Sequence, residues 1–282
     1  MEYSYDTSKD TITVNGVEYD VHREPDRGHP EETLTLRDFD VDKDEFIDPF
    51  PGLEGTLGYE EYTEGMSPRD WSNVGTISVS YRGYDLGDED ISQIDFQRDC
   101  ERCDGDGLRE FTIGDRTITV TCAECQGNGW FEVSPVDYFK EQRGARVVLP
   151  LIVYEHSGIT MRVGHVGDIM GDSAGWDTSF VGFTFDTPEK VKECMGDNVT
   201  DEEIEKALRQ EIESYASYLE GDVTRYIVED DETGYLDSCG GFVGDHKECE
   251  RQCFEALCQA VVKRLAEQTE RAEWNARGVE TK

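Results

Sequence analysis

The sequence predicts an α+β fold, with a mixed or antiparallel sheet, helices towards the C-terminus and a small cysteine-rich insertion. Three observations support this prediction. Segments rich in β-forming residues dominate the chain before residue 187, helical patterns follow residue 200, and two cysteine pairs lie among the strands. The chain has 282 residues, of which 36% are hydrophobic, so it can bury one large core or two ordinary ones.

The strands are predicted from alternation and from turn residues. Residues 11–21 flank Asn15-Gly16, which is a strong signal for a two-residue hairpin. Pro150 lies within another apolar run and indicates a bulge or an edge position there. Residues 22–65 contain few periodic apolar positions and are predicted to be acidic and irregular. Further strands are predicted over residues 75–81, 147–154, 159–163, 180–185 and 223–228.

The helices are predicted from their start signals and apolar stripes. Thr187-Pro188 is typical of a helix start, and Thr200 with Glu203 forms a capping box before a second helix. The apolar stripe of that helix is Ile204, Leu208, Ile212, Tyr215 and Leu219. A last helix is predicted from about Lys247 to Trp274. Its inward-facing residues are Cys253, Leu257, Ala260, Val261 and Leu265.

Two copies of the pattern C-x-x-C-x-G-x-G form the most specific motif of the chain. The first contains Cys100 and Cys103, and the second contains Cys122 and Cys125. Each pair can direct two sulfurs at one ion, because the following glycines permit a tight backbone turn. Four thiolates complete the tetrahedral shell of a structural zinc. We therefore predict one zinc ion on these cysteines; chance pairs or redox thiols would not require the repeated glycines.

Residues 111–121 connect the two cysteine motifs. Their alternating β-formers predict a hairpin that turns at Gly114-Asp115. A hairpin with a metal-binding turn at the base of each strand is the arrangement of a zinc ribbon.

The repeated motif resembles the cysteine-rich zinc module of DnaJ-type Hsp40 co-chaperones. That module carries four such repeats and two zinc ions, whereas this chain has two repeats, within residues 100–130, and so enough for one ion. The chain also lacks the His-Pro-Asp tripeptide of a J-domain. The resemblance therefore implies the metal-binding geometry and not co-chaperone activity.

The net charge of -37 is extreme and arises from 64 acidic and 27 basic residues. Acid excess spread along the whole chain, with Arg favoured over Lys, resembles cytoplasmic proteins of extreme halophiles. Such a surface repels itself unless salt screens it. An acidic mimic of nucleic acid is the alternative, although the charge is not gathered in one run. Direct nucleic-acid binding is not expected, because no Lys/Arg cluster is available to neutralise phosphates.

The cellular compartment is predicted from the same composition. No apolar run approaches the roughly 18 residues of a membrane span, and the N-terminus lacks the features of a signal peptide. Nine cysteines that include two CxxC pairs fit metal binding in a reducing environment better than a disulfide framework. We expect a cytoplasmic protein without membrane contact.

A second candidate site surrounds His156, which follows an apolar strand. A pocket built by His156, Trp176 and Asp177 would make the chain an enzyme, with His156 as the general base. The sequence does not establish that Glu155, His156, Asp172 and Asp177 converge. A structural histidine bonded to a turn is the simpler interpretation.

A second candidate metal site lies near the C-terminus. Its ligands would come from Cys239, His246, Cys249 and Cys253. Cys249 and Cys253 share a helix face, but a free cysteine is commonly a small buried apolar side chain.

A broader resemblance extends over much of residues 67–245. It rests on Trp71–Thr76, Tyr84–Asp88, Leu149–Thr160, Trp176-Asp177, Val181–Phe183, Tyr218–Val223 and Asp237–Cys239. These segments look like a family of proteins encoded by phages, plasmids and other mobile elements, for which no activity is established. The chain departs from that family by its zinc ribbon and by Gly240, where an aromatic residue is usual. The resemblance implies a genomic setting rather than a chemistry.

The sequence divides into three predicted domains: residues 1–98 with a hairpin, an acidic loop and a first core strand, residues 99–132 with the zinc ribbon, and residues 133–282 with an α+β core. The leading hypothesis is a zinc-binding, non-enzymatic accessory protein of a haloarchaeal virus or mobile element that acts through protein contacts. The enzyme and the nucleic-acid mimic are the alternatives.

Overall fold

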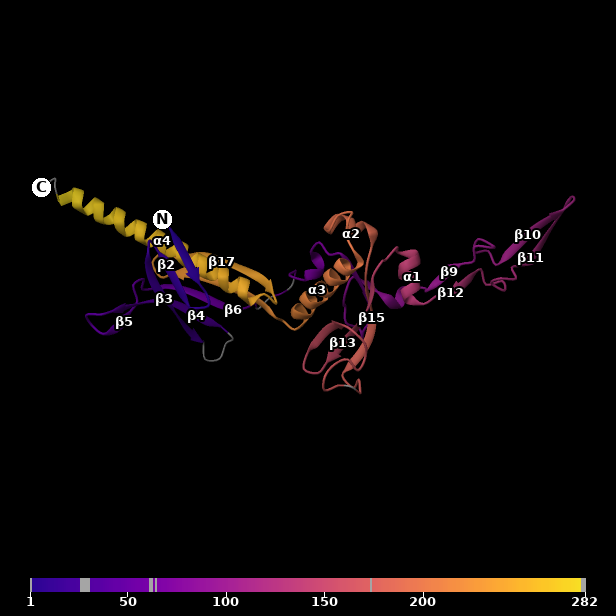
Figure 1. Ribbon diagram of the computed structural model, residues 1–282, viewed down its shortest axis with the longest axis horizontal. Coiled ribbons are helices and arrows are strands. Elements are labelled where there is room, and N and C mark those ends of the chain that lie inside the picture. The colour runs from indigo at the N-terminus through magenta and orange to yellow at the C-terminus, as the bar shows by residue number, and fades with distance from the viewer. Residues whose placement is uncertain (1, 26–30, 61–62, 64, 173, 280–282) are drawn as a thin grey trace. The chain divides into compact units, whose positions relative to one another are not determined.

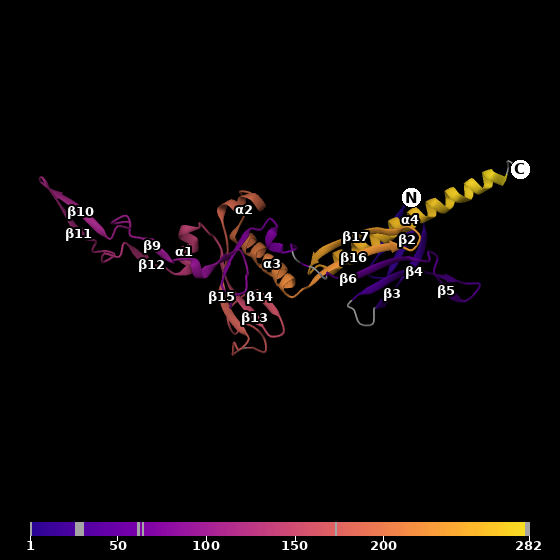
Figure 2. The ribbon, with the colours of Figure 1, turned by 180° about the vertical axis from the view of Figure 1, so that it is seen from behind.

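The computed structural model describes residues 2–25, 31–60, 63, 65–172 and 174–279 (Figure 1, and from behind in Figure 2). The chain forms two compact units. The first combines Met1–Ser67 with Gly221–Lys282, and the second is Pro68–Glu220. The predicted α+β class is confirmed, because the first unit has an antiparallel sheet with the C-terminal helix and the second has a mixed sheet with helices.

The first unit is built on one antiparallel sheet. Hydrogen bonds order the strands β1-β2-β3-β4-β6-β16-β17, and β5 pairs with β4. The hairpin predicted at Asn15-Gly16 joins β2 to β3, with φ of 51° and 83° at its two turn residues. The strands are β1 (Tyr3–Asp6), β2 (Thr11–Val14), β3 (Val17–Pro25), β4 (Glu32–Asp40), β5 (Glu45–Ile47), β6 (Leu53–Tyr59), β16 (Val223–Asp230) and β17 (Gly234–Val243).

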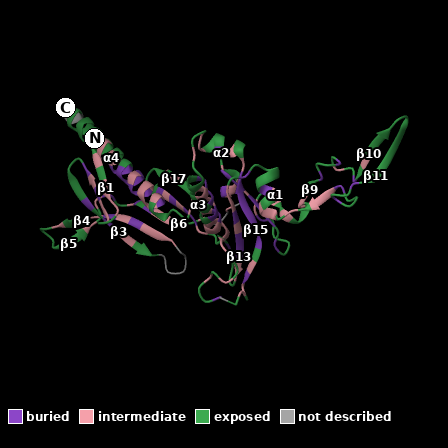
Figure 3. Cartoon of the chain, turned by 45° about the vertical axis from the view of Figure 1, so that its right-hand side comes forward, coloured by how far each residue is buried: buried purple, intermediate pink, exposed green. Residues whose placement is uncertain are grey.

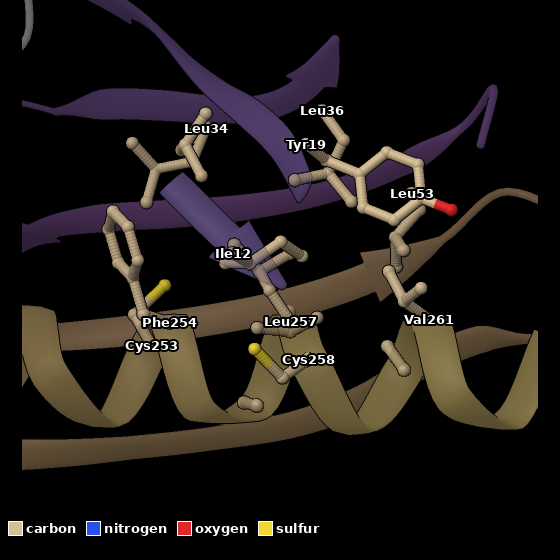
Figure 4. Packing of buried hydrophobic residues seen from close by; sticks show 14 of the residues in the cluster. Ile12, Tyr19, Leu34, Leu36, Leu53, Cys253, Phe254, Leu257, Cys258 and Val261 are labelled. Carbon is tan, nitrogen blue, oxygen red and sulfur yellow. The ribbon is translucent and has the colours of Figure 1, made fainter. Parts of the chain in front are cut away.

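Helix α4 (His246–Val279) covers one face of this sheet and contacts β1 and β2 as well as β6, β16 and β17. Its apolar side chains Phe254, Leu257 and Val261 are fully buried against the strands (Figure 4). Gly55 on β6 allows this approach, because a Cβ there would lie 3.1 Å from the sulfur of Cys253. The predicted inward face of the last helix is thereby confirmed.

The second unit is built on a five-stranded sheet with the order β14-β13-β15-β7-β8. Among its described strand pairs, β7 and β8 run parallel and the others antiparallel, so the sheet is mixed. Pro150 lies on β13, between two neighbouring strands, and a bulge follows between Leu151 and Ile152. The predicted bulge is therefore present, and the edge position is wrong. The strands are β7 (Gly75–Val79), β8 (Glu89–Asp90), β13 (Val148–Glu155), β14 (Ile159–Val163) and β15 (Thr178–Asp186).

Three helices complete the core of the second unit: α1 (Pro135–Gln142), α2 (Pro188–Cys194) and α3 (Asp201–Leu219). The predicted capping box of Thr200 and Glu203 begins α3. The α3 residues Ile204, Leu208, Ile212 and Tyr215 are buried. The Glu211 carboxylate accepts hydrogen bonds from the backbone N–H groups of residues 74 and 75, at 2.6 and 2.9 Å, and so fixes α3 to the start of β7.

The irregular character predicted for residues 22–65 is wrong, although residues 26–30, 61–62 and 64 lie outside the described part. Strands β3, β4, β5 and β6 occupy much of this region. Leu34 and Leu36 are fully buried on one face of β4. The alternation of apolar and polar residues in these strands is short, and Gly55 and Gly58 interrupt it on β6. The sequence of the region therefore shows little of the two-residue periodicity that predicts a strand.

The compact units also differ from the predicted domain boundaries at residues 98/99 and 132/133. The physical reason is strand pairing: β16 joins β6 in one sheet, with Tyr226 opposite Leu57. Residues 221–282 therefore complete the N-terminal sheet rather than a separate C-terminal core. Within the described ranges, no helix has both the length and the apolar character that a membrane crossing requires.

Candidate metal centre

The cysteine motifs lie between two short antiparallel strand pairs of the second unit. Strands β9 (Gln97–Asp99) and β12 (Trp130–Glu132) form a neck, and β10 (Leu108–Ile113) and β11 (Arg116–Thr121) form the predicted hairpin. The first knuckle, Cys100–Gly107, connects β9 to β10. The second knuckle, Cys122–Gly129, connects β11 to β12.

Hydrogen bonds join the two knuckles at both ends. Cys100 N–H donates to the carbonyl of Gly129 at 2.7 Å, and Cys122 N–H donates to the carbonyl of Gly107 at 2.9 Å. Each knuckle therefore begins where the other ends. The reciprocal hydrogen bonds relate the two chain segments by an approximate internal two-fold axis.

The backbone of each knuckle repeats the same unusual conformation. In the first, Asp104, Gly105 and Gly107 have φ values of 49°, 84° and 70°. In the second, the corresponding Gln126, Gly127 and Gly129 have 54°, 94° and 84°. Glycine adopts positive φ with little steric cost, which explains the two glycines in each motif. This turn brings both sulfurs of a knuckle to one side.

The four sulfurs meet at one buried point. Cys100 Sγ lies 3.9 Å from Cys122 Sγ, Cys103 Sγ lies 3.7 Å from Cys125 Sγ, and all four sulfurs lie within 4.8 Å of one another. A zinc ion with Zn–S bonds of about 2.3 Å requires tetrahedral edges of about 3.8 Å. A disulfide requires about 2.05 Å, and all four cysteines are free. The donor set and spacing therefore fit a tetrahedral metal ion.

The surroundings of the sulfurs stabilise the thiolate form of Cys122 more than that of Cys103. Backbone N–H groups, first that of Cys125, lower the pKa of Cys122 to about 7. Burial raises the pKa of Cys103 to about 12. Four buried thiolates would repel one another without a cation, so the tetrad needs a metal ion to hold them together in the ionised form.

The neck fastens the ribbon to the sheet of the second unit. Phe96, just before β9, contacts the rings of Tyr138 and Phe139, with centroid distances of 5.3 and 6.0 Å. Phe139 in turn stacks on Phe185 of β15 at 4.2 Å. This aromatic cluster contains none of the four cysteines.

The structure brings His156 and Asp177 together. His156 Nδ1 lies 3.0 Å from Asp177 Oδ2, and the buried carboxylate of Asp172 orders the loop by accepting the N–H groups of Trp176 and Asp177. Glu155 points elsewhere and accepts the Tyr81 hydroxyl at 2.7 Å. The His156 side chain is 69% exposed and Trp176 is 87% exposed. Within the described residues this is an open hydrogen-bonded pair rather than an enclosed pocket.

The predicted ligands of a second metal do not converge. Cys249 and Cys253 are buried in the core under α4, whereas Cys239 is exposed on β17. His246 Nε2 lies 2.7 Å from Asp222 Oδ1. Across the described part of the chain, the tetrad is the only group of three or more His, Cys, Asp or Glu residues with metal-binding spacing.

One feature near the metal centre has no counterpart in the sequence predictions: the exposure of the β10–β11 hairpin. Every residue of the two strands is exposed except Arg109, which is half-buried (Figure 3). The signal in the sequence was the alternation Arg109-x-Phe111-x-Ile113, which predicts an apolar face.

No protein-family model, curated protein or solved structure matches the chain.

Proposed function

We propose that the chain is a zinc-binding, non-enzymatic accessory protein of a haloarchaeal virus or mobile element that acts through contacts with a protein partner. The observation that carries the proposal is the buried tetrad of sulfurs, whose 3.7 and 3.9 Å separations fit a tetrathiolate ion. Four protein ligands leave no open coordination position, so the zinc is structural.

Zinc binding supplies the folding free energy that the few hydrophobic contacts of the ribbon do not provide. Phe131 is the partly buried apolar side chain that packs against the four cysteines. The binding free energy of structural zinc in finger peptides is about 10–16 kcal/mol, which is enough to fold a segment of this size. A reducing cytoplasm keeps the thiols available for the metal.

One feature argues against a catalytic role, and another agrees with the proposed halophilic origin. Among the described residues, the His156–Asp177 pair lies open to solvent rather than in the water-excluding cleft that general-base chemistry uses. The -37 charge is spread along the chain, which fits a protein that stays soluble in molar salt.

The experiment that tests this proposal compares the zinc-loaded chain with the chain after chelation. We expect one zinc per chain by metal analysis, and cobalt substitution should give the absorption bands of tetrahedral thiolate ligation. Chelation should collapse the amide NMR signals of residues 100–129 and preserve those of β13 and β15, because the aromatic cluster at the neck contains no ligand. Loss of all signals would show that the ribbon and the sheet fold as one unit.

Cysteine variants provide the matched control. Cys100→Ser and Cys122→Ser should each abolish stoichiometric zinc binding, because each removes one of four ligands. Cys194→Ser changes an exposed cysteine at the end of α2 and should bind zinc like the wild type. Retention of full zinc content by both tetrad variants would refute the proposed site.

A further inference from the structure

The β10–β11 hairpin presents one apolar face flanked by arginines. In the antiparallel register Phe111 pairs with Ile118, Arg109 with Val120, and Ile113 with Arg116. Cross-strand partners and alternate residues share a face, so these six side chains lie together. We call them the hairpin face. Its four apolar members are between 42% and 69% exposed.

The charge of the hairpin face is opposite to that of the chain. It carries Arg109 and Arg116 and no carboxylate, whereas the chain has a net charge of -37. Arg109 lies over the ring of Phe111, 4.9 Å from its centroid. Among the described residues, neither guanidinium lies within ion-pair distance of a carboxylate, although other arginines near the ribbon do. Both charges are available to a partner.

The backbone edges of the hairpin carry no further strand in the described part of the chain. Strands β10 and β11 form a sheet of two strands there, so each has one edge without a described neighbour. Two-stranded sheets are marginal in water, and an exposed edge is a template for a further strand. Both strands read Arg-x-apolar-x-apolar: Arg109, Phe111, Ile113 on β10, and Arg116, Ile118, Val120 on β11.

We propose that the hairpin binds an extended segment of a partner protein by strand addition. The complementary segment, antiparallel to either edge, reads apolar-x-apolar-x-carboxylate, which places its acidic side chain beside an arginine of the hairpin face. The inference rests on the proposed function, because the zinc knuckles hold the base of the hairpin through the Cys122 N–H bond to Gly107.

Other occupants fit the same surface less well. A second copy would bring two chains of charge -37 together over only three residue pairs per hairpin, whereas a stable dimer buries about 800 Å² per partner. Nucleic acid would need many phosphates neutralised, and four of the six side chains are apolar.

The test uses a synthetic peptide with the core Ser-Val-Thr-Val-Thr-Glu-Ser and the full-length, zinc-loaded chain. We expect saturable binding by calorimetry, with amide shifts confined to residues 108–121 and new protection from hydrogen exchange along one edge. A peptide with Lys in place of Glu should bind at least about tenfold more weakly, because it meets arginine.

Charge-reversal variants make the test specific. The double variant Arg109→Glu, Arg116→Glu should prefer the Lys peptide. Thr117→Glu, Thr121→Glu adds as many carboxylates to the opposite face and should keep the preference for the Glu peptide. The inference is overturned if the zinc-loaded chain with an ordered hairpin binds neither peptide, or binds both equally, or if the hairpin shifts follow dimerisation of the chain alone. A chain that retains no zinc would instead refute the proposed function itself.

Discussion

Gly107 and Gly129 show how closely the two knuckles approach each other. A Cβ on Gly107 would lie 2.2 Å from the carbonyl oxygen of Gly127, and a Cβ on Gly129 would lie 2.1 Å from that of Gly105. Real Cβ atoms do not approach a backbone oxygen so closely. The glycines are therefore required both for positive φ and for the contact between the knuckles that brings the four sulfurs together.

We expect Gly107→Ala to weaken zinc binding strongly. The substitution adds backbone strain of about 1–3 kcal/mol at φ 70° and also forces the knuckles apart. Gly114→Ala is the matched control, because Gly114 has φ 64° but no atom of the described residues within 4 Å of its Cβ position. Competition with a chromophoric chelator measures both affinities. Equal losses in the two variants would show that strain alone, and not the contact between knuckles, matters.

The cysteines could be predicted from the sequence because a knuckle is a local structure. Its ligands are close in the chain, and its glycines directly indicate the backbone turn. The sequence identifies His156 and Asp177 as candidate site residues but does not predict their contact. The two residues are 21 positions apart and meet because β13 pairs with β15, with Tyr154 opposite Thr178. Register between strands is not encoded in either segment alone.

At the scale of elements, the sequence predicts the hairpins and helices that carry a local turn or capping signal. The hairpins at Asn15-Gly16 and Gly114-Asp115 and the capping box at Thr200 all appear in the structure. Strand β6 was missed because Gly55 stands where α4 packs, which removes an apolar residue from the pattern. Strand β17 was missed because none of its residues is buried, so it shows no alternation of buried apolar and exposed polar positions.

The docking of α4 on the sheet gives a pH-dependent prediction. Arg264 on α4 donates to the buried Asp230 on β16, and this hydrogen bond lowers the pKa of Asp230 to about 2 from its ordinary value of 3.8. Because the pKa of Asp230 is lower in the folded than in the unfolded chain, its ionised form stabilises the fold above pH 4. This stabilisation is lost as the pH falls towards 2 and the carboxylate is protonated. Asp230→Asn should therefore lower the free energy of unfolding by about 2 kcal/mol at pH 7 and by much less near pH 2.

Urea unfolding of the wild type and the variant over this pH range measures the difference. Glu229→Gln is the matched control, because Glu229 is exposed on the same strand. Its effect should be small and should not change with pH in this way. A cost of Asp230→Asn that stays constant between pH 7 and pH 2 would contradict the ion pair as its cause.

At the scale of the whole molecule, the N-terminal unit is discontinuous in the chain. Its hydrophobic cluster combines Ile12 and Leu34 with Phe254 and Val261, which are separated by the entire second unit. No local pattern in the sequence of residues 1–67 predicts that β6 pairs with β16. The fold class could be predicted from the kinds of element present, whereas the division into units depends on this long-range pairing.

The net charge of -37 leads to a prediction for both units at once. Like charges on a compact surface repel one another more than in the unfolded chain, so the fold is destabilised where screening is weak. The Debye length falls from about 10 Å at 0.1 M salt to about 3 Å at 1 M. The thermal unfolding temperature of the zinc-loaded chain should therefore rise steeply with KCl over this range. Sucrose is the control, because it is excluded from protein surfaces but screens no charge. An unfolding temperature that is the same at low and molar KCl would remove the support for a halophilic origin and would show that the acidic surface serves another purpose.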